Sequence, residues 1–131
     1  MTQQQGGKAM RLSLDDSGQR FIIRGFTAQS VRLNDRELTE PFLLTPERLI
    51  ERVPVANLSE LDASHSALLQ SDQPEVVLIG TGSQTRWGAA SVQAALLQQG
   101  IGVEFMDTGA ACRTYTVLAS ELRRVALLIF F

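Results

Sequence analysis

The residues best suited to chemistry lie in two short segments of the C-terminal half. The first is the turn Gly80–Thr85, which directly follows an apolar run, and the second begins at Asp107 and Thr108 and continues through Cys112 and Arg113. Backbone N–H groups at a glycine-rich turn or a helix start can bind a small anion. A cysteine near a helix start can be a nucleophile. These two segments form the candidate site.

The turn has two interpretations. As an anion or ligand site, it would use the backbone of Gly80, Thr81, Gly82 and Ser83. As a structural turn, its glycines would allow close packing of a helix on the sheet, and Ser83 or Thr85 would cap the next helix. It lacks the Gly-Lys-Ser/Thr ending of a phosphate loop and the third glycine of a dinucleotide loop, so nucleotide binding is disfavoured.

Arg86 and Trp87 follow the turn directly. A cation and an indole side by side can form a docking surface, and the indole can equally cover the edge of a sheet. The sequence leaves both alternatives open.

Cys112 also has two interpretations. A helix N-terminus and the adjacent Arg113 would favour its thiolate, as a thiol-dependent enzyme requires. However, His65 is the sole histidine and belongs to a different segment. A catalytic cysteine needs a positioned base, and cysteines beside alanines commonly pack in the core. We therefore assign no catalytic residue, no cofactor and no metal site, since one His and one Cys fall short of a zinc set.

Composition places the chain among small single-domain proteins. It has 131 residues, of which 44% are hydrophobic and 20% charged, with a net charge of −2. No basic footprint for nucleic acid is present. A single cysteine excludes an internal disulfide and favours a reducing compartment, so we expect a cytoplasmic, bacterial protein. The longest apolar run, Val125–Phe131, is far shorter than the roughly 18 residues of a membrane-spanning helix.

The first half predicts a small β meander. Residues 1–18 are polar and read as a flexible leader, and residues 19–131 as one domain. Apolar and β-branched residues cluster at 21–26 and 31–33, and turn residues follow at 34–36. A strand at 42–44, a turn at 45–48 and a strand at 49–53 come next. Residues 59–70 have helical spacing and predict an amphipathic helix.

The second half predicts a β-α-β-α-β unit. Strands are expected at 76–79, 101–106 and 125–131, and helices at 89–99 and 108–122. Gly100 is placed to end the first helix, and Asp107 or Thr108 to cap the second. Short right-handed crossovers would put helices on both faces of the sheet, with 76–79 central between the other two strands. The fold class is α/β, in three layers.

The order of these motifs resembles the Mth-domain family. The resemblance rests on the strand and turn Val77–Gly82, on Met106–Thr108, on Ala110–Tyr115, and on Glu121, Arg123 and Val125. Roughly 110 residues are covered, which is most of the chain. Two departures stand out, because Leu122 occupies a position where many relatives have Gly, and Thr116 one where many have Asn.

That family includes uncharacterised bacterial and archaeal proteins, a mitochondrial respiratory complex I assembly factor and the adipogenesis-associated Mth-domain-containing protein. The resemblance implies a three-layer α/β fold with a mixed sheet and no established reaction. We therefore expect a non-enzymatic binding or assembly domain with an unidentified protein partner. The alternative is an anion-binding or small-molecule-binding protein, or a thiol-dependent enzyme, with its site at Gly80–Thr85 near Cys112. The sequence sets no oligomeric state.

Overall fold

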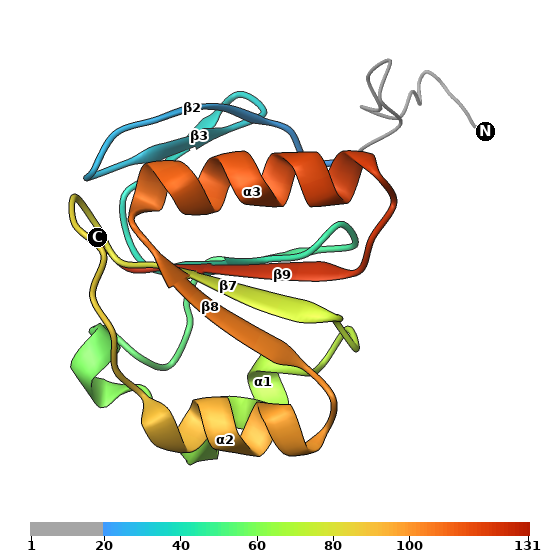
Figure 1. The fold of residues 1–131 in the computed structure, drawn as a ribbon. Coiled ribbons are helices and arrows are strands. Elements are labelled where there is room, and N and C mark those ends of the chain that lie inside the picture. The colour runs from blue at the N-terminus through green and yellow to red at the C-terminus, as the bar shows by residue number, and fades with distance from the viewer. Residues whose placement is uncertain (1–19) are drawn as a thin grey trace.

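The computed structural model describes residues 20–131, so the predicted leader lies outside the described residues. Figure 1 shows one central sheet, with helix α3 and a second, smaller sheet over one face and helices α1 and α2 over the other. This arrangement confirms the predicted three-layer α/β fold with a mixed sheet.

The central sheet has the strand order β6-β5-β9-β7-β8. Strand β7 (Val76–Gly80) pairs in parallel with β8 (Gly102–Met106) on one side and with β9 (Val125–Ile129) on the other. Strand β5 (Phe42–Leu44) pairs antiparallel with β9 and with the short β6 (Leu49–Ile50). The predicted flanks of β7 are confirmed, although β9 is the middle strand. Strands β7 and β9 are apolar because both of their faces are covered, whereas β8 at the edge carries the exposed Glu104.

Alternating side chains of these strands feed two cores. Helix α3 (Thr108–Ser120) packs Ala111, Cys112 and Tyr115 against Leu78 and Leu127. On the opposite face, helix α2 (Ala90–Gln98) packs Val92 and Leu96 against side chains such as Val77, Ile79 and Leu128. Neighbouring residues of one strand therefore belong to different cores, as the two-residue period of a strand requires.

The predicted meander is the second sheet, with the order β2-β3-β4. Its strands are β2 (Ile23–Phe26), β3 (Val31–Leu33) and β4 (Arg36–Leu38). Asn34 forms the tight turn between β3 and β4 in a left-handed conformation, with φ 55°. Val31, Leu33 and Leu38 join the core beside α3, and β2 packs on that helix.

The predicted continuous helix over residues 59–70 is wrong. The segment forms the 3₁₀ turns η1 (Leu58–Glu60) and η2 (Ala63–His65), followed by the short helix α1 (Ser66–Leu69). Leu61 has an extended backbone and is buried, which ends η1. Asp62 then accepts the Ser64 N–H and donates its own N–H to His65 Nδ1, which starts a new turn.

The remaining predicted elements are confirmed, with small differences at their ends. Helix α2 ends before Gly100, which has φ 78° as a left-handed cap requires. The turn at Thr45–Arg48 leads into β6, which is shorter than predicted.

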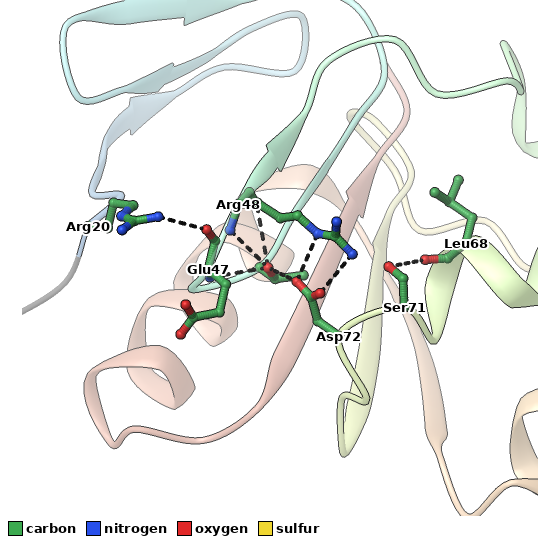
Figure 2. Close-up of polar contacts among 7 residues, drawn as sticks. Arg20, Glu47, Arg48, Leu68, Ser71 and Asp72 are labelled. Carbon is green, nitrogen blue, oxygen red and sulfur yellow. Dashed lines mark hydrogen bonds and ion pairs between the residues drawn. The ribbon is translucent and has the colours of Figure 1, made fainter.

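A network of polar contacts fixes that turn (Figure 2). Asp72 binds Arg48 through an ion pair of 2.8 Å and accepts the Thr45 hydroxyl at 2.5 Å. Arg20 donates to the Glu47 carbonyl oxygen at 3.1 Å. These contacts tie the β5–β6 turn to the loop that leads into β7. A pocket of about 370 Å³ opens beside them, and Asp72 and Thr45, which help to line it, already bind protein groups. We assign the network to structure.

Candidate functional site

The three parallel strands end at the same edge of the sheet, and the candidate segments meet there (Figure 1). Gly80 pairs with Met106 on one side and with Ile129 on the other. The loop after β7 leads to one face of the sheet, and α3 begins on the opposite face. A ligand crevice of an α/β sheet lies at such a divergence. The geometry there decides whether the predicted anion site is open.

Gly80 lies in a closely packed position. A Cβ there would overlap the end of the Ile129 side chain and lie 3.3 Å from Ala111 Cβ. The Ile129 side chain and helix α3 would both have to shift to admit a side chain at position 80. This contact agrees with the structural interpretation of the first glycine.

Gly82 and Thr108 bind one another across the crevice. The Gly82 N–H donates to Thr108 Oγ1 at 3.0 Å, and the Thr108 N–H donates to the Gly82 carbonyl at 2.9 Å. Gly82 has φ 94°, a conformation that favours glycine. Two of the N–H donors expected for an anion are thus bound to protein atoms.

Thr81 anchors the loop that follows β7. Its N–H donates to the Met106 carbonyl at 2.8 Å, and its buried hydroxyl accepts the Arg86 N–H at 3.0 Å. The hydroxyl proton faces the carbonyl oxygens of Gln84, at 2.7 Å, and Met106, at 3.0 Å. The residue fixes both ends of the Thr81–Arg86 turn.

The predicted link between this turn and a helix is wrong. Helix α2 begins only at Ala90, after a loop that includes Ser83 and Thr85. Its N-cap is Ala89, which has φ 54° and no side-chain cap bond. Ser83 is exposed and neither it nor Thr85 caps α2. The N-terminus of α2 is therefore not part of the Gly80–Thr85 turn.

Asp107 is the N-cap of α3. Its carboxylate accepts the Ala110 N–H at 2.9 Å, and its carbonyl accepts the Ala111 N–H at 2.9 Å. The capping prediction is confirmed at Asp107, whereas Thr108 is the first helical residue.

Arg113 lies on the exposed side of α3 and stacks over the Phe26 ring, 5.7 Å from its centroid. It points toward β2 and the meander, and its guanidinium forms a cation–π contact there.

Cys112 is buried in the core that α3 shares with the sheet. It is the fifth residue of α3 and therefore lies beyond the first turn of the helix. Burial raises the pKa of its thiol to about 12, although the neighbouring Arg113 acts in the opposite direction. At neutral pH the sulfur is a protonated thiol. His65 lies in the η2 turn, and Asp62 donates to its Nδ1.

The Arg86–Trp87 segment lies at the surface beside a pocket. The Trp87 side chain is 76% exposed. Beside it is a pocket of about 360 Å³, here named the Trp87 pocket. Its lining residues come from the loop after β7, from the segment around η1 and from the end of β9: Asn57, Leu58, Ser59, Thr81, Arg86, Trp87, Gly88, Phe130 and Phe131.

Sequence reasoning found one wall of this pocket and missed the others. The parallel register of β7 and β9 was the available signal for Phe130 and Phe131, because it brings the residues that follow both strands to one edge. Asn57, Leu58 and Ser59 line the pocket because of how the connection between β6 and α1 packs. No local sequence pattern predicts this packing.

The comparisons with known proteins agree with this fold. Residues 23–130 match the family described as "Protein of unknown function (DUF498/DUF598)". The chain belongs to this family. A solved structure from Xanthomonas campestris has a TM-score of 0.79 and 37% identity, and the match covers 92% of each chain. A Bordetella pertussis protein described as a Mth938-like domain has a TM-score of 0.70 and 26% identity, over 84% of this chain and 85% of the other. The resemblance to the Mth-domain family is confirmed.

Two relatives have names that refer to a location or to a function. The "13 kDa major membrane protein" of Francisella tularensis subsp. holarctica (strain LVS) is 30% identical, over 74% of this chain and 80% of the relative. NADH dehydrogenase (ubiquinone) 1 alpha subcomplex assembly factor 3 of Danio rerio is also 30% identical, over 80% of this chain. The match spans only 61% of the assembly factor's length. The similarity supports an assembly-type role.

Within residues 20–131, no helix is both long and apolar enough to cross a membrane. In the same range, no group of three His, Cys, Asp or Glu side chains is placed to hold a metal ion.

Proposed function

We propose that this chain is a non-enzymatic protein-binding domain of the assembly type, whose partner docks at the Trp87 pocket. The observation that supports this proposal most directly is the exposure of Trp87 beside Arg86 and Phe131. Tryptophan and arginine are enriched among the residues that contribute most to the binding free energy of protein interfaces. An exposed aromatic side chain beside a pocket can insert into a partner, and the pocket can receive a side chain of that partner. A large side chain that is 76% exposed contributes little to the chain's own core.

The loop that presents Trp87 is preorganised for binding. Thr81 holds the turn before it through hydrogen bonds to Met106 and Arg86. A loop already ordered in the free protein loses less conformational entropy when a partner docks. In this proposal, Gly80, Gly82, Asp107 and Thr108 support the loop and the start of α3, and Ser83 lies on the exposed side of the turn.

The proposed partner is a protein of a respiratory NADH dehydrogenase during its assembly. The similarity to an assembly factor for that enzyme supports this class of partner. The name of the Francisella relative fits a protein that works beside a membrane. A cytoplasmic location, from which the chain would reach the membrane face of a growing complex, is part of the same proposal.

The catalytic alternative has less support at this edge of the sheet. A thiol enzyme needs a reactive thiolate, and Cys112 is buried and protonated at neutral pH. An anion site at Gly82 needs free N–H donors, and that donor binds Thr108. The groups that the sequence singled out for chemistry therefore support the architecture.

A deletion and complementation experiment tests the proposal. The gene is deleted in a host that carries NADH dehydrogenase, and the wild-type chain, Trp87→Ala or Leu97→Ala is returned. Leu97 is a matched control because it is also exposed, at 67%, but lies on α2 outside the pocket. Loss of a hot-spot tryptophan costs about 2 kcal/mol of binding free energy, or about 30-fold in Kd. Assembled enzyme, measured on native gels, should fall in the Trp87→Ala strain alone.

The result separates two parts of the proposal. If deletion leaves the amount of assembled enzyme unchanged, the proposed partner is wrong. If Trp87→Ala restores assembly as fully as the wild type, the docking site is wrong. Melting temperatures of both purified variants should match the wild type, which excludes unfolding as the cause of a loss.

A further inference from the structure

A second hollow lies between β2 and α3, on elements that the Trp87 pocket does not use. It has a volume of about 380 Å³. Strand β2 contributes Arg24, Gly25 and Phe26, and α3 contributes Arg113 and Val117. We name it the β2–α3 groove.

The groove is cationic and apolar. Arg24 stands on one wall and Arg113 on the other, and no carboxylate is among its lining residues. The salt bridges found among residues 20–131 include neither arginine. The whole chain carries 12 basic and 14 acidic side chains, a net charge of −2. The groove is therefore a local positive site on a chain whose net charge is slightly negative.

The apolar side chains of the groove are partly exposed. Phe26 is 38% exposed and Val117 is 54% exposed, although both are large hydrophobic residues. The Arg113 guanidinium lies over the Phe26 ring at 5.7 Å, which fixes the direction of the cation. A ligand that makes a charge contact with Arg113 would therefore meet an apolar surface beside it.

Gly25 leaves room for a second chain. A Cβ built at this residue would meet no heavy atom within 4 Å. Strand β2 is also an edge of its sheet, since the order is β2-β3-β4. Gly25 also lies at a register shift between β2 and β3. A glycine in a strand is typical of such a bulge and also of a place where another backbone approaches closely, and the open space at Gly25 permits that approach.

We propose that the β2–α3 groove binds an acidic peptide segment of a partner protein, with carboxylates on Arg24 and Arg113 and an apolar side chain between Phe26 and Val117. Charge complementarity favours an acidic peptide, because Arg24 and Arg113 lie on opposite walls and no carboxylate lines the groove. This site is separate from the Trp87 pocket and does not depend on a role in NADH dehydrogenase assembly.

Peptide binding to the purified full-length chain tests the proposal. The probe is a short fluorescent peptide of alternating Glu and Val, and its control has Lys in place of Glu. Fluorescence anisotropy should show saturable binding of the acidic peptide alone, weaker at high salt because charge contacts are screened. Arg24→Glu and Arg113→Glu should each raise Kd at least about tenfold, as loss of a charge-assisted contact predicts. Arg52→Glu, an equal charge change outside the groove, should stay within about twofold.

A shape test complements the charge test. Gly25→Leu adds a side chain whose Cβ lies in open space, without a change of charge. It should weaken peptide binding at least about fivefold if the peptide backbone lies close to β2. Amide NMR shifts in β2 and α3 of the wild-type chain should identify the groove as the contact surface.

Several outcomes would overturn the proposal. They are no binding of the acidic peptide at millimolar concentration, equal binding of the lysine peptide, or unchanged affinity in the Arg24→Glu and Arg113→Glu variants. Binding to phosphatidylglycerol vesicles that requires both arginines, with no peptide binding, would assign the groove to a membrane surface. Concentration-dependent self-association lost in the same variants, again without peptide binding, would assign it to a second copy of the chain.

Discussion

Gly82 and Thr108 exchange hydrogen bonds in both directions, at 3.0 and 2.9 Å, although 25 residues separate them along the chain. The pair joins the loop after β7 to the first residue of α3. It thereby occupies the crevice where an α/β sheet of this topology would otherwise offer N–H donors to a ligand. The N–H groups of Gly82 and Thr108 are thus bound to protein atoms, and the exposed Trp87 lies at the same edge of the sheet.

Replacing Thr108 with Val tests the importance of this pair. Valine keeps the shape of the side chain and removes the Oγ1 acceptor, which leaves the Gly82 N–H without its partner in a buried site. An unsatisfied buried donor costs about 1–3 kcal/mol, so the free energy of unfolding in urea should fall by that amount. Thr116→Val is the control, because Thr116 is exposed and its hydroxyl bonds within its own helix. Equal effects of the two substitutions would contradict the assignment.

Asp107 should stabilise the start of α3 through its side chain. Asp107→Ala removes the acceptor of the Ala110 N–H and should lower the free energy of unfolding by about 1 kcal/mol. Asp107→Asn keeps an acceptor at the same position and should recover most of that loss. Urea unfolding of the three proteins measures the difference. An alanine variant as stable as the wild type would show that the cap contributes nothing.

Leu122 is held in a conformation that favours glycine. Its φ is 62°, and the bonds from Leu122 N–H to Ala119 and from Arg123 N–H to Leu118 close the end of α3 as in a Schellman motif. The side chain is 85% exposed and so gains little from packing. Leu122→Gly should therefore stabilise the fold by about 1 kcal/mol.

The same substitution within a helix should have the opposite sign. Leu97 is exposed in the last turn of α2, and Leu97→Gly should destabilise by up to about 1 kcal/mol because glycine loses more backbone entropy in a helix. Thermal melts of both variants give the two signs directly. If Leu122→Gly instead destabilises the fold, the leucine side chain makes a stabilising contact that outweighs the cost of its left-handed backbone.

Local patterns predicted the parts of the fold that depend on neighbouring residues. The β-branched run of β7, the Asp107 cap and the left-handed Gly100 each follow from side-chain chemistry within one turn or strand. Pairing of β7 with β8 and β9 followed from the short crossovers. These predictions needed no knowledge of distant contacts.

Other features depended on packing across the chain. The break before α1 arises because Leu61 is drawn into the core, and helical spacing alone cannot show that. The predicted start of α2 at residue 89 lies within one residue of the observed start at Ala90, but the helix begins at a left-handed Ala89 and not at a Ser83 or Thr85 cap. For the site, the sequence identified Arg86 and Trp87, but the remaining walls of the Trp87 pocket come from segments distant in sequence.

Cys112 separates a binding domain from a thiol enzyme most directly. Because burial raises its pKa to about 12, the folded chain holds almost no thiolate at pH 7. Iodoacetamide should therefore modify the native protein far more slowly than the same chain unfolded in urea, where the thiol pKa is about 8.5. Mass spectrometry against time gives both rates. Fast modification of the folded chain that persists at pH 6 would restore the thiol-enzyme alternative.

The same pKa shift predicts how stability depends on pH. The folded pKa lies above the unfolded one, so the stabilising contribution is complete below about pH 8.5 and is lost as pH rises toward about 12. In that window the unfolded chain releases a proton that the folded chain retains, and stability falls by up to about 1.4 kcal/mol per pH unit. Cys112→Ala should remove this slope between pH 9 and 10, below the range where Tyr115, whose pKa is also raised by burial, begins to contribute. Identical slopes for wild type and Cys112→Ala would show that the thiol already ionises in the folded protein at its ordinary pKa.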